Sequence, residues 1–504
     1  MSKINRRKFI STVGIGAAGI ILASKISVNA KTKPNFVVVL GEGFGWSNTS
    51  GQMDEGVAGS KSSFIQTPNL ENLAKQGMRF SNGYAASPRC TPSRASLFTG
   101  KTPGLLKMTF VNMGGNTKQG GDGEVVGDNF KLQSPRPTIE LPNSEITIGE
   151  VLKNSGYATA HFGKWHVGRT NPSSHGFDES DGATNNGGPE NVRNPNPKEA
   201  YGMTERGINF MSKQVKANKS FYLQLSHYAG RREEDALPET YAAALKRLNG
   251  DERIAGEAAV FEDMDKTIGM LLKKIDELGI ADNTYVLYTA DHGAAGQRAN
   301  EPLRGGKGTL WEGGIRVPFI IRGPGIKPNT FSKTRVMAFD ILPTFAELAG
   351  VEKPLPNDIE GGSFAKVLLA GGTGEVKRKR EELVFHFPHY DNGNDGPATA
   401  IMQGNLVAIK TYETGKLDLY DIVKDISERK DLSNQMPEKA AELEKKMNAY
   451  LTEINAQMPV QNPNFDPSKP ASSTRGGGGR GGEGGGGGGR RGNQDRRKPP
   501  TEQE

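Results

Sequence analysis

Cysteine and long apolar runs are what this sequence most clearly lacks. There is one cysteine, Cys90, in 504 residues, so no internal disulfide can form. The apolar run near the N-terminus, residues 13–23, is too short to cross a bilayer, and we expect no stable membrane span. No cysteine lies at the cleavage site that follows this run, which argues against a lipid anchor there.

The body of the chain also lacks an excess of basic charge, although the formal net charge is +7. Residues 1–33 carry seven bases and no acid, and residues 475–504 carry seven bases against four acids. Residues 34–474 are therefore left with about −3. A body of that charge does not suit a nucleic-acid surface, so we expect no nucleic-acid partner.

Both ends of the chain differ in composition from its body. Residues 1–30 combine adjacent arginines, the short apolar run and a small-residue cleavage site, which is typical of a twin-arginine signal peptide. We therefore expect export machinery as a partner and a periplasmic or secreted protein. Residues 467–504 are Gly/Arg-rich with almost nothing apolar, which predicts a disordered tail.

The body reads as two parts. Apolar strand-like runs alternate with helical patterns over residues 31–375, which favours an α/β catalytic domain. Residues 376–466 hold short strand patterns separated by turns and then a helical pattern, which predicts a small antiparallel-sheet-plus-helix subdomain.

Small, hydroxylated and basic residues surround the lone cysteine in the segment Ser87-Pro-Arg-Cys-Thr-Pro-Ser-Arg-Ala-Ser-Leu-Phe-Thr-Gly100. A cysteine that merely fills a core would lie in an apolar run. Pro92 fixes φ and Ser93 can cap a helix, so Arg94 and its successors should form first turns whose free N–H groups face Cys90. The segment predicts a reactive residue at an anion-binding site.

Metal-ligand side chains follow two runs typical of buried parallel strands. Glu42 comes just after residues 36–40, and Asp291 and His292 come just after residues 285–290. Ligand sites in open α/β sheets lie at the carboxyl ends of strands. Glu42, Asp291 and His292 are therefore candidate ligands for a divalent cation.

Two further segments offer groups for an anionic substrate. Lys164 and His166 follow a strand pattern, and alternation in an extended segment would point both to one face. There the lysine could hold charge and the histidine could move protons. Glycines on both sides of Lys307 let the backbone approach a substrate.

Cys90-x-Pro-Ser-Arg94 followed by Thr-Gly resembles the signature of the type I sulfatases, and residues 302–319 resemble their second long signature. The resemblance covers about residues 34–466. It implies an alkaline-phosphatase-like α/β fold, with a large mixed sheet flanked by helices and the small C-terminal subdomain. It also implies that a maturase oxidises Cys90 to formylglycine (3-oxoalanine), whose hydrated aldehyde is the nucleophile.

The resemblance further implies roles for individual residues. Calcium or another divalent metal would be held by Glu42, Asp291, His292 and the modified Cys90. His166 would help to break down the sulfated intermediate. The charge on the sulfate oxygens would be balanced by Arg94, Lys164, Arg231 and Lys307. Additional substrate contacts are expected from His227, Arg231 and His389.

The chain departs from the sulfatase pattern at two positions. Gly43 stands where a second metal-binding aspartate is usual, which would weaken a calcium site unless another oxygen, such as that of Asn48, fills the place. Arg231 stands where a histidine that protonates the leaving oxygen is usual. Arginine can bind sulfate but is a poor general acid, which leaves Lys307 or His389 for that role.

The sequence favours a sulfatase that acts on sulfated polysaccharides or sugars. Two alternatives stay open at this point. One is a phosphoester or phosphonate hydrolase of the same superfamily, and the other is a catalytically inactive protein that binds sulfated glycans.

Overall fold

The central strand of the protein is β1 (Asn35–Gly41), every residue of which is buried. It pairs in parallel with β7 (Phe221–Ser226) on one side and with β8 (Thr284–Ala290) on the other. A strand covered on both faces needs apolar residues throughout, which explains its unbroken apolar run. The computed structural model describes residues 33–111, 129–185, 197–295, 298–391 and 393–470.

These strands belong to an eight-stranded sheet in the order β10-β2-β9-β8-β1-β7-β5-β6. Its pairings are parallel except those that β9 makes with β2 and β8. The other members are β2 (Met78–Phe80), β5 (Ala158–Gly163), β6 (Glu179–Ser180), β9 (Phe319–Arg322) and β10 (Thr330–Ser332). The large mixed sheet predicted from the sequence is confirmed.

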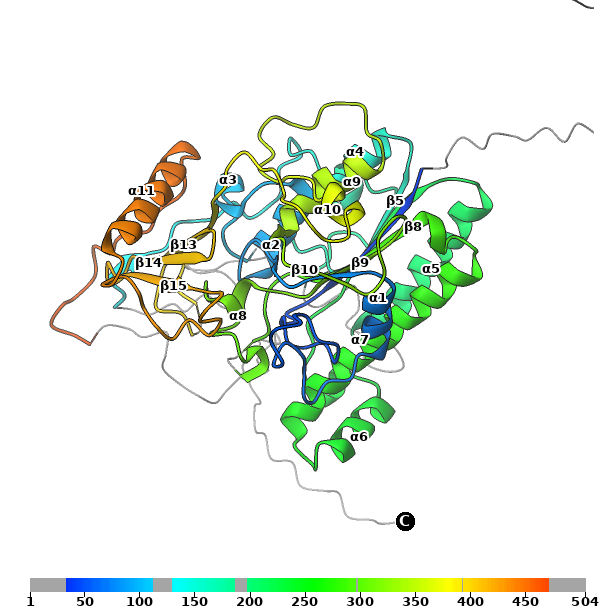
Figure 1. Ribbon diagram of the computed structural model, residues 1–504, viewed down its shortest axis with the longest axis horizontal. Helices are drawn as coiled ribbons and strands as arrows, with labels where there is room; N and C mark the ends of the chain where they lie inside the picture. The colour runs from blue at the N-terminus through cyan, green and yellow to red at the C-terminus, as the bar shows by residue number, and fades with distance from the viewer. Residues whose placement is uncertain (1–32, 112–128, 186–196, 296–297, 392, 471–504) are drawn as a thin grey trace, which may run out of the picture.

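Alternate residues of β1 contribute to two separate cores, one on each face of the sheet. Val37 and Val39 pack into one core, and Phe36, Val38 and Leu40 pack into the other. Figure 1 shows the helices on the two sides of the sheet. The first core is covered by α1 (Pro68–Gln76), α5 (Ala200–Lys216), α6 (Pro238–Arg247) and α7 (Glu252–Glu277). The second is covered by α2 (Cys90–Thr99), α3 (Pro103–Leu106), α4 (Ile148–Asn154), α9 (Ile341–Leu348) and α10 (Ala365–Leu369).

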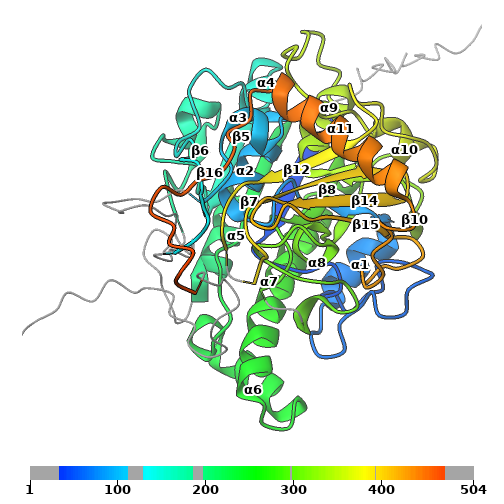
Figure 2. The same cartoon turned by 90° about the vertical axis from the view of Figure 1, so that its left-hand side faces the viewer.

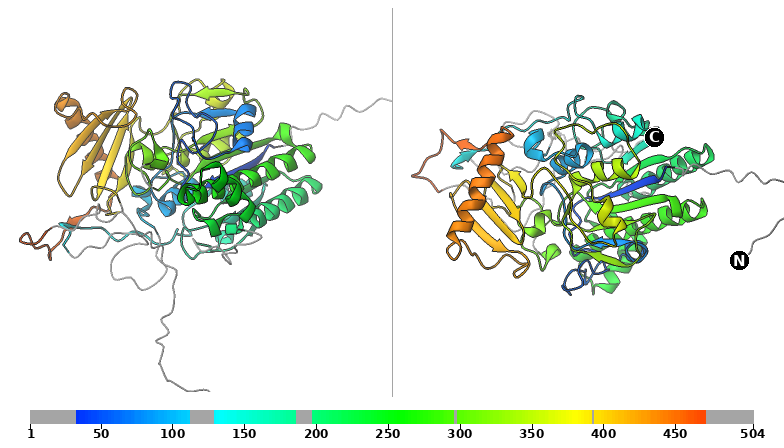
Figure 3. Two further views of the ribbon diagram at one scale, coloured as in Figure 1. Left: turned by 90° about the horizontal axis from the view of Figure 1, so that it is seen from below. Right: turned by 45° about the horizontal axis from the view of Figure 1, so that its top comes forward.

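A second sheet stands at one end of the molecule (Figure 3). It is antiparallel, in the order β12 (Leu383–Phe387), β13 (Ala398–Gln403), β14 (Leu406–Thr411) and β15 (Leu417–Asp421). Figure 2 shows α11 (Pro437–Glu453) lying across its outer face. Its inner face packs against the larger body through a core that includes Tyr84, Phe110 and Phe339. The predicted small sheet with its helix is therefore confirmed.

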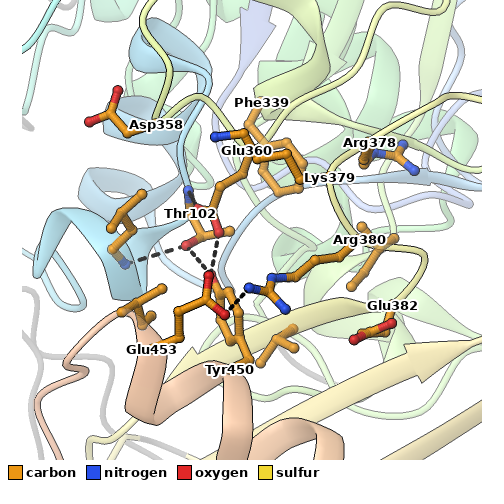
Figure 4. A pocket seen from close by; sticks show the side chains of 14 residues that line it. Thr102, Phe339, Asp358, Glu360, Arg378, Lys379, Arg380, Glu382, Tyr450 and Glu453 are labelled. Carbon is orange, nitrogen blue, oxygen red and sulfur yellow. Dashed lines mark hydrogen bonds and ion pairs between the residues drawn. The ribbon is translucent and has the colours of Figure 1, made fainter.

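A pocket of about 200 Å³ lies at the joint between α11 and the larger body (Figure 4). The hydroxyl of Tyr450 on α11 donates to Glu360 Oε1 at 2.8 Å and lies 2.6 Å from Thr102 Oγ1. Arg380 of the same pocket pairs with Glu453. These bonds cross the joint, and they fix the small sheet and α11 against the body.

Short elements complete the described structure: β3 (Gly83–Tyr84) with β11 (Val336–Met337), β4 (Leu132–Gln133) with β16 (Val460–Gln461), and α8 (Glu312–Ile315). Within the described residues, no helix is both long and apolar enough to span a membrane. The predicted signal peptide lies outside the described residues, as does nearly all of the predicted tail, residues 471–504.

Candidate active site

The helix α2 begins at Cys90 itself, four residues earlier than a cap at Ser93 would place it. The predicted cap is therefore wrong. The Ser93 hydroxyl instead donates to the Ser87 carbonyl at 2.8 Å and accepts from the Ser87 N–H at 3.1 Å, which folds the preceding loop onto the first turn. Pro92 lies in that first turn, where proline is tolerated because the N–H has no intrahelical partner. Cys90 is held, buried, at the positive end of the helix.

The three predicted metal ligands and Cys90 form one buried cluster. The parallel register pairs Gly41 of β1 with Ala290 of β8, so the residues that follow, Glu42 and Asp291, leave the sheet side by side. One ligand atom from each of Glu42, Cys90, Asp291 and His292 lies within 4.8 Å of the others. The Cys90 thiol is 3.4 Å from Glu42 Oε1.

The cluster fits a divalent cation. The His292 Nδ1 lies 2.9 Å from the Gly293 carbonyl, which leaves the buried Nε2 facing the carboxylates; within the described residues this Nε2 has no hydrogen-bond partner. Burial and the neighbouring Glu42 raise the pKa of Asp291 to about 6. Burial opposes a charged His292, but Asp291 outweighs it and the pKa of the imidazole rises to about 9. The cluster thus attracts positive charge, and its oxygen and nitrogen donors suit calcium or another divalent ion.

Arg94 is hydrogen-bonded to two members of this cluster. Its guanidinium donates to Asp291 Oδ2 and Glu42 Oε2, both at 3.0 Å, and to the Lys164 carbonyl at 2.5 Å. The side chain is completely buried. With its donors used in this way, Arg94 fixes the carboxylates and the ends of several strands relative to one another.

Two lysines and a histidine surround the thiol. Lys164 Nζ lies 2.8 Å from Glu42 Oε2, and Lys307 Nζ lies 3.7 Å from Glu42 Oε1. Burial and Glu42 oppose ionisation of Cys90, but Lys164, Lys307 and His166 outweigh them and lower the pKa of the thiol well below its usual range. The site therefore stabilises negative charge on the side chain at position 90.

His166 reaches the site by another route than the one predicted. The segment after β5 is not extended, because Gly163 has φ +92° and His166 has φ +57°. The backbone of His166 is held there by a hydrogen bond from Thr91 Oγ1 to its carbonyl at 2.8 Å. Burial and Lys164 lower the pKa of its imidazole, so it is a neutral group able to accept a proton.

His227 and Arg231 follow β7 on the far side of β1. His227 is buried, its N–H donates to the Leu40 carbonyl at 2.9 Å, and burial with nearby Arg94 lowers the pKa of its imidazole to about 3. Arg231 is only partly buried, and its guanidinium donates to the Ala295 carbonyl at 3.3 Å. Both therefore border the cluster.

The amide of Asn48 is engaged elsewhere. Its Oδ1 accepts from the Gly45 N–H at 2.5 Å, and its Nδ2 donates to the Ala299 carbonyl at 2.9 Å. The amide thus closes the turn after β1, with both of its polar atoms engaged there. Its role as a substitute metal ligand stays a prediction.

His389 belongs to the small-sheet side of the molecule. Its Nε2 lies 2.8 Å from Thr109 Oγ1, and its ring packs against Phe110 and Phe387 at centroid distances of 4.8 and 5.6 Å. Two residues further on, the buried Asp391 forms a bidentate ion pair with Arg89, the residue before α2. Sequence reasoning missed Asp391 and Thr91, because neither carries a motif of its own.

The comparisons with known proteins agree with this geometry. A family model described as Sulfatase matches residues 34–351, and one described as N-sulphoglucosamine sulphohydrolase, C-terminal, matches residues 306–457. The chain is 27% identical to a sulfatase of Formosa agariphila, covering 90% of this chain and 95% of that one. It is 30% identical to the N-acetylgalactosamine-6-sulfatase of Sus scrofa, covering 75% of this chain and 71% of that one.

The fold agrees as well. The crystal structure of Ps i-CgsB in complex with k-i-k-neocarrahexaose superposes with a TM-score of 0.68 at 24% identity, covering 84% of this chain and 94% of that one. Fold and site together define a hydrolase of the alkaline-phosphatase-like class. Within that class the chain belongs to the sulfatase family, and it is a sulfuric ester hydrolase.

Proposed function

We propose that this sulfatase removes sulfate from sulfated sugars or polysaccharides, using a formylglycine formed from Cys90 as its nucleophile. The observation that carries the proposal is the convergence of Glu42, Asp291 and His292 on the Cys90 side chain, with two lysines beside it. The substrate class is supported by the name of the Sus scrofa relative, which acts on a sulfated amino sugar.

The side chains divide the chemistry among them. The side chain at position 90, as a hydrated aldehyde, presents a hydroxyl that attacks the sulfur of the sulfate ester. Calcium or another divalent ion held by Glu42, Asp291, His292 and the oxygen at position 90 would supply Lewis-acid stabilisation of the developing charge. Lys164 contributes fixed positive charge from the buried side of the site.

Proton transfers fall to His166 and Lys307. His166 is neutral and close to position 90, so it can take a proton from the second hydroxyl and so expel sulfate from the covalent intermediate. Lys307 is partly exposed and its Nζ lies 3.7 Å from Glu42 Oε1, which suits protonation of the leaving sugar oxygen. His389 is the weaker candidate for this acid, because its ring is buried between aromatic neighbours.

The proposal includes the route to the mature enzyme. Residues 1–30 act as a twin-arginine export signal, a maturase converts Cys90, and the enzyme works in the periplasm or outside the cell. Sequencing the N-terminus of the exported protein tests the first part. A start near residue 31 is expected.

The experiment that tests the function combines mass spectrometry with parallel assays. The chain is produced with a maturase, the Cys90 peptide is weighed, and hydrolysis is measured on a panel of sulfated sugars and on a phosphate monoester. We expect conversion of Cys90 and preferential release of sulfate, and no release from a Cys90→Ala control. A fully converted enzyme that hydrolyses none of the sulfated sugars would contradict the proposal and favour a sulfated-glycan binding protein.

A further inference from the structure

The backbone at Gly43 leaves a space that a guanidinium fills. Gly43 has φ +59°, in the left-handed region that favours glycine. A Cβ built at this position would lie 3.0 Å from Arg231 Nη2 and 3.2 Å from His292 Cε1. A side chain at position 43 would therefore crowd the guanidinium of Arg231 and the ring of His292, and both would have to shift by a few tenths of an ångström.

Arg231 is positioned by contacts from three neighbouring segments. Its backbone N–H donates to Asp235 Oδ2 at 3.1 Å, and its Nη1 donates to the Ala295 carbonyl beyond β8. On the packed helix α7, Glu257 shares an electrostatic interaction with it. Among the described residues, the Ala295 carbonyl is the one hydrogen-bond acceptor of the guanidinium, so N–H donors remain on the side of Gly43 and His292.

Cationic side chains outnumber the carboxylates around this point. Arg94, Lys164 and Lys307 pair with Glu42 or Asp291, and Arg231 lies beside them at Gly43 and His292. Arg94 and Lys164 already form ion pairs with the carboxylates. Arg231 is planar and forked, so it can bind two oxygens of one sulfate group.

We propose that Gly43 and Arg231 act as a pair that gives this site a sulfate-binding position independent of the divalent ion. The glycine leaves room for the guanidinium, and the guanidinium binds two sulfate oxygens. This inference rests on the proposed function, because it places the sulfate group of the substrate at the same cluster.

Calorimetry with inorganic sulfate tests the pair on the exported chain. Inorganic sulfate is not hydrolysed and its binding needs no formylglycine, so a failed activity assay and a failed binding assay remain distinguishable. We expect sulfate to bind in EDTA, and Arg231→Ala to weaken that binding at least about tenfold. The matched control is Arg232→Ala, whose side chain is 65% exposed and pairs with Glu234; it should change the affinity less than about twofold.

Measuring the coupling between positions 43 and 231 distinguishes the proposed pair from a general effect of charge. Gly43→Ala should displace the guanidinium and weaken sulfate binding in the wild-type background, with little further effect in Arg231→Ala. Gly350→Ala controls for backbone strain, because Gly350 has φ +64° and a Cβ there meets nothing within 4 Å. Arg231→Lys keeps the charge but not the fork, so it should give an intermediate affinity and serves if Arg231→Ala does not fold.

Three results would overturn the inference. Sulfate binding that disappears in EDTA would make the metal, not Arg231, the binding group. An affinity unchanged in Arg231→Ala would remove the residue from the sulfate position. Equal losses for Gly43→Ala in both backgrounds would show that the two positions act separately.

Discussion

The ion pair between Arg89 and Asp391 connects the start of α2 to the small-sheet side of the protein. Asp391 is completely buried and Arg89 is 8% exposed. The contact is bidentate, with Arg89 Nε donating to Asp391 Oδ2 at 2.5 Å. Asp391→Ala would leave the Arg89 guanidinium buried without its carboxylate, and breaking such a pair costs about 3–5 kcal/mol.

The measured shift in Tm depends on how much of the molecule unfolds with the pair. At about 2.1 cal/mol/K per residue, a cooperative body of roughly 400 residues would lose about 4–6 °C. A separately unfolding subdomain of roughly 90 residues would lose about 15–25 °C from its own transition. Differential scanning calorimetry of Asp391→Ala therefore reports both the strength of the pair and the size of the cooperative unit.

A surface pair in the same subdomain is the matched control. Lys410 on β14 and Glu444 on α11 lie 2.8 Å apart, with side chains 24% and 31% exposed. Glu444→Ala should cost less than about 1 kcal/mol, because solvent already screens this pair. If Asp391→Ala shifts the transition no more than Glu444→Ala does, the buried pair does not stabilise the protein as argued.

Three further expectations concern the metal, the general acid and pH. Chelating divalent ions should lower Tm and sulfatase activity together, and calcium should restore both. An ion at 100 times its Kd adds about 2.7 kcal/mol to the free energy of unfolding. If prolonged chelation changes neither Tm nor activity, the metal site is contradicted. Lys307→Ala should cost about 10²–10⁴-fold on a sugar sulfate and much less on an activated aryl sulfate, and equal losses would exclude it as the acid. Burial lowers the pKa of His386 to about 4, below its unfolded value near 6.5. The neutral imidazole therefore contributes up to about 3 kcal/mol to the free energy of unfolding, which is present above pH 6.5 and lost as pH falls toward 4. Between pH 6.5 and 4, the Tm of His386→Gln should thus fall less steeply than the Tm of the wild type. Equal slopes of Tm against pH would refute this role of His386.

Much of the site could be predicted because parallel strands bring their carboxyl ends together. Glu42 and Asp291 follow neighbouring strands, so an apolar run followed by a ligand residue was enough to place both at one edge. The buried core could be predicted from the apolar run of β1, because a strand covered on both faces has to be apolar on both. Local pattern was sufficient wherever position along a strand determined position in space.

The rest depends on contacts between remote segments or on unusual backbone angles. Asp391 meets Arg89 across 302 positions of the chain, and no local pattern marks either as the partner of the other. His166 reaches the site through a left-handed backbone held by Thr91, whereas simple alternation assumes an extended one. The start of α2 was misplaced because Ser93 is a good cap in isolation, but its hydroxyl is used by the loop at Ser87.

Burial separates the cationic side chains that the sequence grouped together. Arg94 and Lys164 are completely buried and hydrogen-bonded to Glu42, so a substrate could reach neither without breaking those bonds. Lys307 is 18% exposed and 3.7 Å from the same carboxylate, and Arg231 is partly buried over the bare backbone of Gly43. The inner pair thus holds two carboxylates in place, where they can hold a cation, and in the proposed mechanism the outer pair would meet the sulfate ester. On that proposal a site with no carboxylate at position 43 would still bind an oxyanion, because the charge that meets the substrate would come from the outer pair.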